Sequence, residues 1–307
     1  MTGHSTVDIS PYAEALASVP GRERHTVVAG VDCAYWEYGA ASAVGTIVAI
    51  HGFRGDHHGL EAIIASLGGR HVIAPDLPGF GASAPFEDRA HDIAGYAAWL
   101  GEFVSALGAE GPVTILGHSF GSIIVAAALA NGLVVPEPGH VVLINPIGQN
   151  ALHGPRALGT ALAVFYYWLG RVLPERLGQA WLRSRVIVRG MSVAMAKTHD
   201  PQLRAWIHEQ HDTYFSAFAN RTQLLEAFRA SVSHDVSEFA ASVTAPTLLI
   251  AAAQDDVTPL SAQRRLATLF PNARLEVIEG VGHLVHYETP LIAADLVTRF
   301  VGDEATA

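Results

Sequence analysis

The strongest chemical signal in the chain is a serine set between two glycines. Residues Val113–Gly121 read VTILGHSFG and place Ser119 in a G-x-S-x-G between an apolar run and an apolar helical window. A serine hydroxyl is a weak nucleophile, so it must be held exposed beside a base. A sharp turn between a strand and a helix holds the serine exposed, although the backbone at the serine is strained. The chain packs closely at this turn, so only small residues such as Gly117 and Gly121 fit on either side. The pattern therefore predicts nucleophilic catalysis by Ser119.

Further motifs surround this serine in an order that indicates a known family. Ile50–Phe53 (IHGF) and Asp76–Ser83 (DLPGFGAS) precede it. Ala251–Pro259 (AAAQDDVTP) and Gly280–Pro290 (GVGHLVHYETP) follow it. From about residue 20 to about residue 302, the chain resembles the α/β-hydrolase-fold superfamily, in the branch that carries a helical cap after the sixth strand.

The resemblance implies the other two members of a catalytic triad, in the chain order Ser, acid, His. The family pattern places the acid four residues before a proline, which indicates Asp255 before Pro259, with Asp256 as the alternative. His283 aligns with the family's base in the stretch G-x-G-H-x-x-x-x-E-x-P. Such a histidine takes the proton of the serine, and the acid orients the histidine. We expect His286 to face the cap or to pack on a helix.

The resemblance also implies an oxyanion hole built from main-chain N–H groups. In the family, one donor lies in the turn after the third strand, and the other is the residue after the nucleophile. By position these donors are Phe53 and Phe120. Removing one such donor typically costs about 3 kcal/mol of transition-state stabilisation. We expect the neighbouring His51 to order the loop.

A metal site is the alternative reading of the histidines in this loop. The chain holds 16 histidines, and His51, His57 and His58 lie close together in sequence. No carboxylate–histidine pattern such as H-E-x-x-H accompanies them. We therefore expect neither a metal nor a cofactor, and instead a solvated loop or hydrogen bonds from Arg54 or Asp56.

Short apolar runs alternate with helical windows and position these motifs. The expected strands are His25–Val28, Asp32–Tyr38, Thr46–Ile50, His71–Ala74, Val113–Leu116, Val141–Ile144, Thr247–Ile250 and Leu275–Ile278. The expected helices are Leu60–Leu67, Ile93–Leu107, Phe120–Leu129, Ser261–Leu269 and Leu291–Phe300. Such alternation implies crossovers and a mostly parallel sheet, with ligands beyond the carboxyl ends of the strands. We predict an α/β fold: a mostly parallel eight-stranded sheet flanked by helices (the α/β-hydrolase fold), with an inserted all-helical cap.

The alternation breaks once, between about Gln149 and Val236, where no strand is evident. We place the cap at residues 148–235 and the hydrolase core at residues 1–147 plus 236–307. The cap holds ten Lys or Arg and six Asp or Glu, so it carries +4 and the rest of the chain −14. The residues expected to break its helices are Gly170, Pro174, Gly190 and Pro201.

One segment of the cap bears on the substrate. Ala157–Gly170 (ALGTALAVFYYWLG) is apolar around most of its circumference, which is typical of a helix that is buried or lines an apolar pocket. Tyr166, Tyr167 and Trp168 are therefore candidate substrate-binding residues for a bulky apolar group. Two alternatives stay open: the aromatic side chains only pack the cap on the core, or the cap arginines dock it peripherally at a membrane.

Composition excludes several classes of protein. Of the 307 residues, 50% are apolar and 16% are charged, so the chain can bury a sizeable core. A net charge of −10 argues against a nucleic-acid partner, and the single cysteine, Cys33, cannot form an internal disulfide. The uncharged stretch Gly111–Pro136 breaks into strand, turn and helix, and the N-terminal residues lack a long apolar run. We expect a cytoplasmic protein that does not insert stably into a membrane. The sequence leaves its oligomeric state open.

The predicted function is that of a serine hydrolase acting on a small molecule. It would cleave an ester, lactone or thioester bond of a small to medium, largely apolar substrate. A serine at position 119 argues against the haloalkane dehalogenases and epoxide hydrolases of this fold, which use an aspartate. A C–C bond hydrolase or lyase is an alternative, although Leu284 stands where a tryptophan often follows their histidine. A ligand-binding or signalling protein with low turnover is the other alternative.

Overall fold

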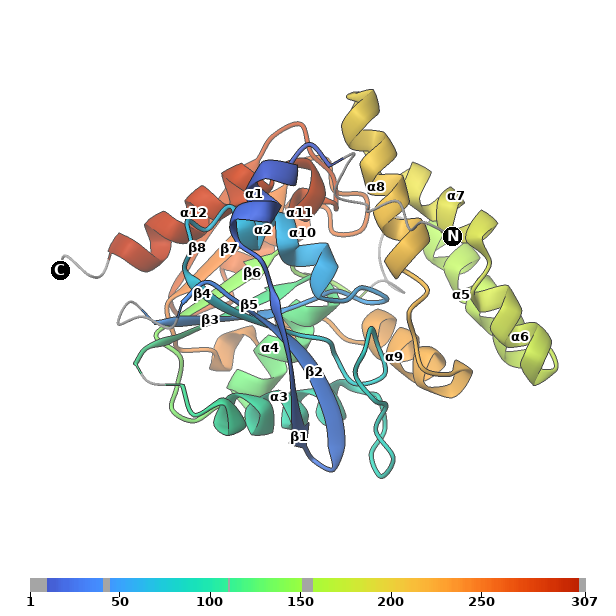
Figure 1. Cartoon of the computed structure of the whole chain (residues 1–307), viewed down its shortest axis with the longest axis horizontal. Coiled ribbons are helices and arrows are strands. Elements are labelled where there is room, and N and C mark those ends of the chain that lie inside the picture. Colours follow the sequence, from blue (N-terminus) through green and yellow to red (C-terminus); the bar gives the residue numbers. More distant parts are fainter. Residues whose placement is uncertain (1–9, 41–44, 110, 151–156, 304–307) are drawn as a thin grey trace.

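The protein is built around one eight-stranded sheet (Figure 1). The structure is a computed structural model, and it describes residues 10–40, 45–109, 111–150 and 157–303. The strand order is β1-β2-β4-β3-β5-β6-β7-β8. β2 pairs antiparallel with both β1 and β4, and every other pair is parallel. The strands are β1 (Arg22–Val28), β2 (Val31–Tyr38), β3 (Thr46–Ile50), β4 (His71–Pro75), β5 (Val113–His118), β6 (His140–Ile144), β7 (Thr247–Ala252) and β8 (Ala273–Ile278).

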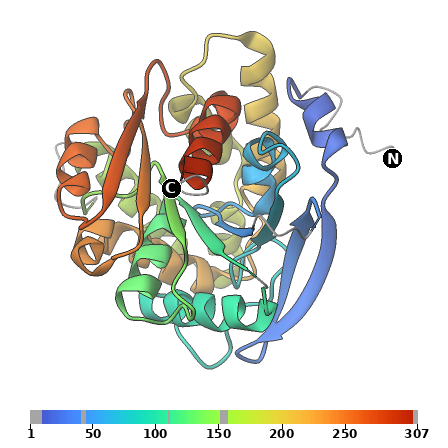
Figure 2. The ribbon, with the colours of Figure 1, turned by 90° about the vertical axis from the view of Figure 1, so that its left-hand side faces the viewer.

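Helices cover both faces of the sheet, because the strands are apolar on both faces (Figures 1 and 2). Val48 and Ile50 of β3 share a buried cluster with α3 and α4, whereas Ile47 and Ala49 share one with α2 and α12. Successive side chains of a strand point to opposite faces, which accounts for this division. The helices and short 3-10 turns outside the insertion are α1 (Ala13–Ser18), η2 (His57–Leu60), α2 (Glu61–Ala65), α3 (Ile93–Leu107), α4 (Phe120–Ala130), η4 (Val236–Glu238), η5 (Ala240–Ser242), α10 (Leu260–Ala267), α11 (Val285–Glu288) and α12 (Pro290–Asp303).

The predicted fold class is confirmed. All eight expected strands are present, and each is extended by at most three residues at its ends. β1 and β2 form a hairpin that turns at Ala29-Gly30, where both residues have a positive φ. The expected helix Ile93–Leu107 is present with those bounds, begun by the side chain of Asp92, which accepts a hydrogen bond from the N–H of Gly95.

Between β6 and β7 the described elements are all helical. Before the short turns η4 and η5, they are α5 (Ala157–Val172), α6 (Glu175–Leu182), α7 (Arg185–Met195), α8 (Pro201–Tyr214) and α9 (Arg221–Ser233). α5 to α7 form the end of the molecule farthest from α12 (Figure 1). We refer to residues 148–235 as the inserted segment. The domain boundaries that we placed around it stay a prediction.

The expected helix breakers in the inserted segment were half wrong. Pro174 and Pro201 stand where α6 and α8 begin, but Gly170 and Gly190 lie inside α5 and α7. A Cβ atom on Gly170 would lie 2.6 Å from the side chain of Leu182. Gly170 is therefore explained by the close approach of α5 and α6 and not by a break in the helix.

None of the helices in the described part of the chain combines the length and the apolar character needed to cross a bilayer.

Candidate active site

Ser119 occupies a strained turn between β5 and α4. β5 ends at His118 and α4 begins at Phe120, and the serine between them has φ 51° and ψ −116°. A non-glycine residue in this region of φ carries about 1–3 kcal/mol of strain. A Cβ atom on Gly121 would lie 2.5 Å from the carbonyl oxygen of Ile50. The glycine therefore lets the start of α4 approach the end of β3, as the sequence pattern predicts.

Three side chains from separate loops meet at this turn. The hydroxyl oxygen of Ser119 lies 2.9 Å from Nε2 of His283, and Nδ1 of His283 lies 2.8 Å from Oδ2 of Asp255. Because Nδ1 faces a carboxylate, it carries the proton of the neutral imidazole. Nε2 is then the acceptor for the serine hydroxyl. The arrangement can move a proton from the serine to the imidazole.

The loop after β7 decides which aspartate faces His283. Oδ1 of Asp255 accepts hydrogen bonds from the N–H groups of Val257 and Thr258, and Oδ2 accepts one from the hydroxyl of Thr258. Burial raises the pKa of Asp255, but its interactions with His283 and Thr258 outweigh burial and hold that pKa below its ordinary value. Asp255 is therefore an anion at neutral pH.

Asp256, the alternative acid, turns away from His283. Its side chain is 55% exposed and forms an ion pair with Lys197. The register of this single loop separates two neighbouring aspartates into a buried partner of the histidine and a surface partner of a lysine.

The turn after β3 lies against Ser119 and against the cavity that opens beside this serine. Phe53 and Phe120 both line this cavity, and their rings are 6.1 Å apart. In the turns and loops of the described residues, neither of their N–H groups donates to a main-chain carbonyl. His51 orders the turn as expected: its Nδ1 lies 2.8 Å from the Gly52 carbonyl oxygen, and its Nε2 accepts a hydrogen bond from the Leu77 N–H at 2.8 Å.

Arg54 is buried and hydrogen-bonded, which agrees with the second of the two alternatives that we expected for this loop and not with a solvated loop. Its side chain is 1% exposed, its φ is 63°, and no carboxylate among the described residues forms an ion pair with it. Instead its guanidinium donates to the carbonyl oxygens of Leu182 and Phe215, at 2.8 and 2.9 Å, and to the hydroxyl of Tyr167. All of these partners belong to the inserted segment. Arg54 therefore fastens the turn after β3 to that segment.

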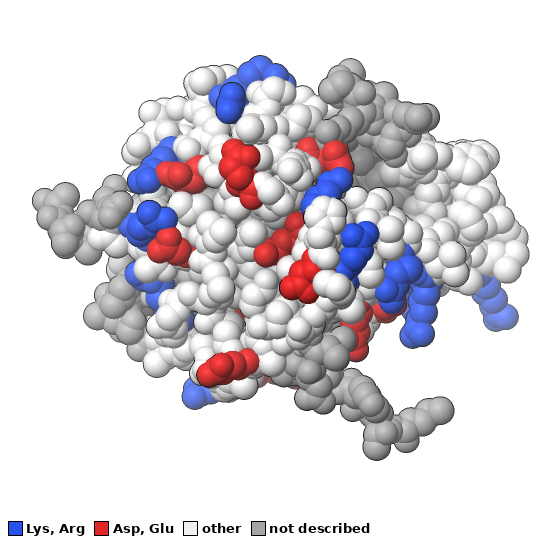
Figure 3. All heavy atoms as spheres, turned by 90° about the horizontal axis from the view of Figure 1, so that it is seen from above, with Lys and Arg blue, Asp and Glu red and all other residues white. Residues whose placement is uncertain are grey.

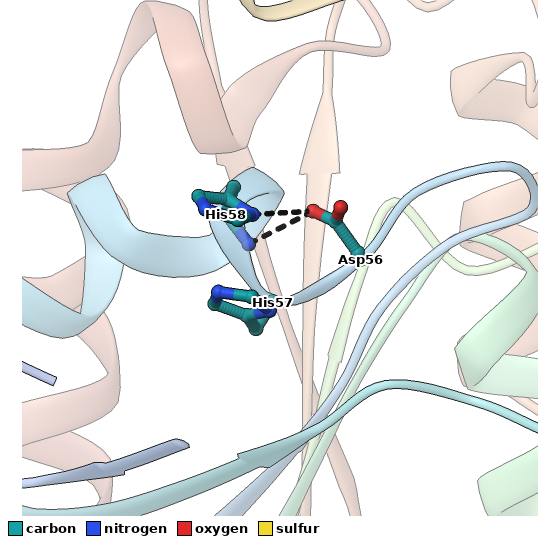
Figure 4. Close-up of side chains that lie close together, drawn as sticks. All are labelled: Asp56, His57 and His58. Atoms are coloured by element: carbon teal, nitrogen blue, oxygen red, sulfur yellow. Dashed lines mark hydrogen bonds and ion pairs between the residues drawn. The ribbon is translucent and has the colours of Figure 1, made fainter. Parts of the chain in front are cut away.

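The two histidines that follow are held by aspartates. His57 lies with its Nδ1 2.9 Å from Oδ1 of Asp76, and the Nδ1 of His58 lies 3.1 Å from Oδ1 of Asp56. Figure 4 shows the carboxylate of Asp56 turned towards His58, with the ring of His57 beneath.

This group is also the one among the described residues whose ligand atoms lie close enough to hold a metal ion. One atom from each of Asp56, His57 and His58 can be chosen so that all lie within 4.8 Å of one another. The hydrogen bonds to Asp56 and Asp76 already account for the orientation of both rings. The expectation that the protein needs neither a metal nor a cofactor stays a prediction.

A mostly apolar cavity of about 270 Å³ opens beside Ser119. Of the three aromatic residues that we expected there, Tyr167 alone lines it. Tyr166 donates its hydroxyl to the carbonyl oxygen of Leu182 at 2.8 Å, and the side chain of Trp168 is 51% exposed outside the cavity. Tyr166 therefore packs within the inserted segment, and Trp168 faces away from the cavity. The prediction that these two residues line the pocket was wrong.

The cavity also contains histidines that the sequence analysis did not assign to it. His118, His211 and His286 line it beside His283. Burial is the main cause that lowers the pKa of His118 and of His211 to about 3, and burial also lowers the pKa of His286 well below its ordinary value. Within the described residues, Nε2 of His118 and Nδ1 of His286 have no hydrogen-bond partner. The position of His118 next to the serine was the only signal in the sequence.

Comparisons with known proteins agree with this architecture. YugF, an uncharacterized hydrolase of Bacillus subtilis, is 25% identical over 285 residues, which cover 91% of this chain and 97% of YugF. RutD of Klebsiella pneumoniae, which is proposed to be a carbamate hydrolase, is 30% identical over 207 residues, covering 62% of this chain and 67% of RutD.

A solved structure shares the fold at lower identity. The esterase EaEST from Exiguobacterium antarcticum superposes with a TM-score of 0.73 at 17% identity, over 92% of this chain and 100% of the esterase. Residues 45–290 match the family described by the alpha/beta hydrolase fold. The chain therefore belongs to the α/β hydrolase fold family.

Proposed function

We propose that the protein is a serine hydrolase that cleaves an ester, lactone or thioester bond through an acyl-enzyme on Ser119. One observation carries the proposal: the two hydrogen bonds that join Ser119, His283 and Asp255 at the edge of an apolar cavity. A hydroxyl, an imidazole and a buried carboxylate that are hydrogen-bonded in this order form the arrangement that activates a serine for attack on a carbonyl.

The mechanism follows from these positions. His283 takes the proton of Ser119 as the hydroxyl oxygen attacks the carbonyl carbon of the substrate. The N–H groups of Phe53 and Phe120 donate to the oxyanion, and Asp255 stabilises the imidazolium that has formed. When the tetrahedral intermediate collapses, His283 gives the proton to the leaving group. A water molecule, deprotonated by the same imidazole, then releases the acyl group as a carboxylic acid.

The cavity supports a substrate that is small to medium and largely apolar. Its volume of about 270 Å³ lies just below the usual range of about 300–1,000 Å³ for ligand pockets. Its walls include Tyr167, Phe215, Phe228 and Met195. His118 and His211 beside them are neutral at pH 7 because burial lowers their pKa values. An uncharged acyl group suits such walls.

A carbamate is the second candidate substrate, because RutD carries that proposed activity and is 30% identical to this chain. The carbonyl of a carbamate is open to the same attack by Ser119. The comparison with RutD is a reason to test a carbamate as well as esters. The geometry of Ser119, His283 and the cavity supports an ester.

The decisive experiment combines labelling with a substrate panel. We expect a fluorophosphonate probe to label the wild type and a Ser105→Ala control, whose serine is exposed on α3, but not Ser119→Ala. The panel contains p-nitrophenyl esters from acetate to octanoate, a lactone series, a thioester and an aryl carbamate. Labelling that persists in Ser119→Ala would overturn the assignment of Ser119 as the nucleophile. Labelling without turnover of any substrate would favour a ligand-binding protein.

A further inference from the structure

The outer face of the inserted segment gathers most of the exposed apolar surface of the described chain. Fifteen large apolar side chains are exposed, and eight of them lie between Leu162 and Val193. We call these eight the outer apolar face: Leu162, Val164, Phe165, Trp168 and Val172 of α5, Leu177 of α6, and Val186 and Val193 of α7. Exposed apolar side chains gathered in this number on one segment indicate an interaction site.

Helix α5 is apolar on two opposite faces. Tyr166, Tyr167 and Gly170 are buried towards the protein, whereas Phe165 and Trp168 are 56% and 51% exposed and stack at 5.8 Å. A helix on a protein surface normally presents charged and polar residues to water. Between Ala161 and Gly170, the outer side of α5 lacks such residues, so a partner that removes it from water would be favourable.

The charges within the segment from α5 to α7 are almost all positive. Residues 157–195, which span α5 to α7, contain five arginines and one carboxylate, Glu175. Arg171, Arg176 and Arg185 are exposed, and none of the ion pairs found among the described residues includes them. Figure 3 shows this end of the molecule, on the right, as largely uncharged, with Lys and Arg along one rim. The partner must therefore carry negative charge.

A second copy of the chain does not meet this requirement. Two copies joined by the outer apolar face would bring two sets of exposed arginines together, and like charges across an interface cost free energy. An anionic bilayer surface matches both the charge and the apolar character of this face, because its headgroups attract arginines and its acyl region accepts apolar side chains. Tryptophan is enriched at such interfaces.

We propose that the outer apolar face docks on the surface of an anionic lipid bilayer. Phe165 and Trp168 enter the headgroup region, and Arg171, Arg176 and Arg185 contact lipid phosphates. The opposite side of α5 supplies Ala163 and Tyr167 to the wall of the Ser119 cavity. Docking through α5 therefore places the cavity one helix away from the lipid.

Vesicle co-sedimentation tests this proposal independently of the hydrolase activity. The probes are vesicles of phosphatidylcholine and phosphatidylglycerol in equal parts, and vesicles of phosphatidylcholine alone. We expect the full chain to pellet with the anionic vesicles at low salt, much less at 0.5 M salt, and not with phosphatidylcholine alone. Ser119→Ala should bind as the wild type does, which separates docking from catalysis.

Two sets of variants locate the docking face. The triple variant Arg171→Gln, Arg176→Gln, Arg185→Gln should lower the partition coefficient roughly 100-fold, at about 1 kcal/mol for each arginine near the surface. Phe165→Ser with Trp168→Ser should lower it about tenfold or more. The matched control is Leu291→Ser with Ile292→Ser, which changes two exposed apolar residues of α12 and should leave binding unchanged.

Three outcomes would overturn the proposal. The first is no pelleting with anionic vesicles at low salt. The second is binding that both sets of variants leave intact. The third is a dimer in sedimentation velocity that the Phe165 and Trp168 variant dissolves while no vesicle binding occurs, which would assign the face to a second copy. All of the changed side chains are exposed, so circular dichroism should report an unchanged fold.

Discussion

Two adjacent aspartates in the loop after β7 show how finely a single residue position divides their roles. Asp255 is held by the N–H groups and hydroxyl of the residues that follow it, and its Oδ2 meets His283 at 2.8 Å. Asp256 lies on the surface with Lys197. The same residue type therefore supplies a fixed buried anion at one position and a solvated surface charge at the next.

Replacing Asp255 by asparagine should remove most of the activity. The amide cannot stabilise the imidazolium and can favour the wrong tautomer of His283, so we expect kcat to fall by about 10³–10⁴-fold. Asp256→Asn is the matched control and should keep kcat within about twofold. The measurement is hydrolysis of the best ester in the panel. Equal losses in the two variants would contradict the assignment of Asp255.

The small residues of the turn at Ser119 make their own prediction. Gly121→Ala places a Cβ atom 2.5 Å from the Ile50 carbonyl oxygen, so the start of α4 must move away from the end of β3. We expect the free energy of unfolding to fall by about 1–3 kcal/mol and fluorophosphonate labelling to slow markedly. Gly190→Ala, within α7 and with no atom close to the new Cβ, should instead stabilise by about 0.5–1 kcal/mol. Urea denaturation compares the two, and a Gly121→Ala protein as stable as the wild type would refute the packing argument.

At the scale of elements, Arg54 joins the turn after β3 to helices more than a hundred residues away in sequence. Its partners are the end of α6, the residues after α8 and the tyrosine hydroxyls of α5. The bond geometry suits only a planar group with donors in fixed directions. The inserted segment and the turn that lines the Ser119 cavity are thereby held as one unit.

Arg54→Met should weaken that connection. The substitution leaves the Phe215 carbonyl and the Tyr167 hydroxyl without their donor, and each buried polar group left unpaired costs about 1–3 kcal/mol. We expect the free energy of unfolding to fall by about 2–4 kcal/mol in urea, on that basis. Arg299→Met removes an exposed arginine paired with Asp295 on α12 and should cost about 0–1 kcal/mol. Similar losses in the two variants would show that Arg54 contributes no more than a surface arginine.

For the molecule as a whole, burial of neutral histidines ties stability to pH. The folded-state pKa values of His118, His211 and His286 are depressed, mainly by burial, whereas the unfolded chain binds a proton at each near pH 6.5. The unfolded state therefore binds more protons below pH 6.5, and folded stability falls as pH falls through that value. Above pH 6.5 the contribution of these histidines is constant.

Acidification should reveal how many histidines contribute. Each buried neutral histidine lowers the free energy of unfolding by up to about 1.4 kcal/mol per pH unit between pH 6.5 and pH 5. His286→Leu should flatten that slope by about one such contribution in urea titrations from pH 7.5 to 5. His25→Asn is the control: the hydrogen bonds that His25 donates to Asp32 and Glu23 raise its pKa, so its removal should not flatten the slope. An unchanged slope in His286→Leu would contradict the buried neutral state.

The amino-acid sequence by itself determined the positions of the strands along the chain, the fold class, the inserted helices and the serine of the candidate site, but it left Asp255 and Asp256 as alternatives for the acid. These features depend on local signals, because apolar runs, turn residues and short motifs act within about ten residues of the backbone. The triad candidates were identified by a resemblance, and their catalytic roles stay a proposal. The antiparallel pairing of β1 with β2 likewise follows from a hairpin that is local in sequence.

Only the tertiary structure decided which side chains face the cavity. The sequence showed that Tyr166, Tyr167 and Trp168 belong to a helix that is apolar around most of its circumference, and for that reason it could not determine which of them turns inward. The burial of Arg54 depends on carbonyl groups more than a hundred residues away, and no local pattern records them. The same holds for the cluster of His118, His211 and His286, whose members come from β5, α8 and α11. Contacts between distant segments are set by how whole elements pack, and that information is distributed over the chain.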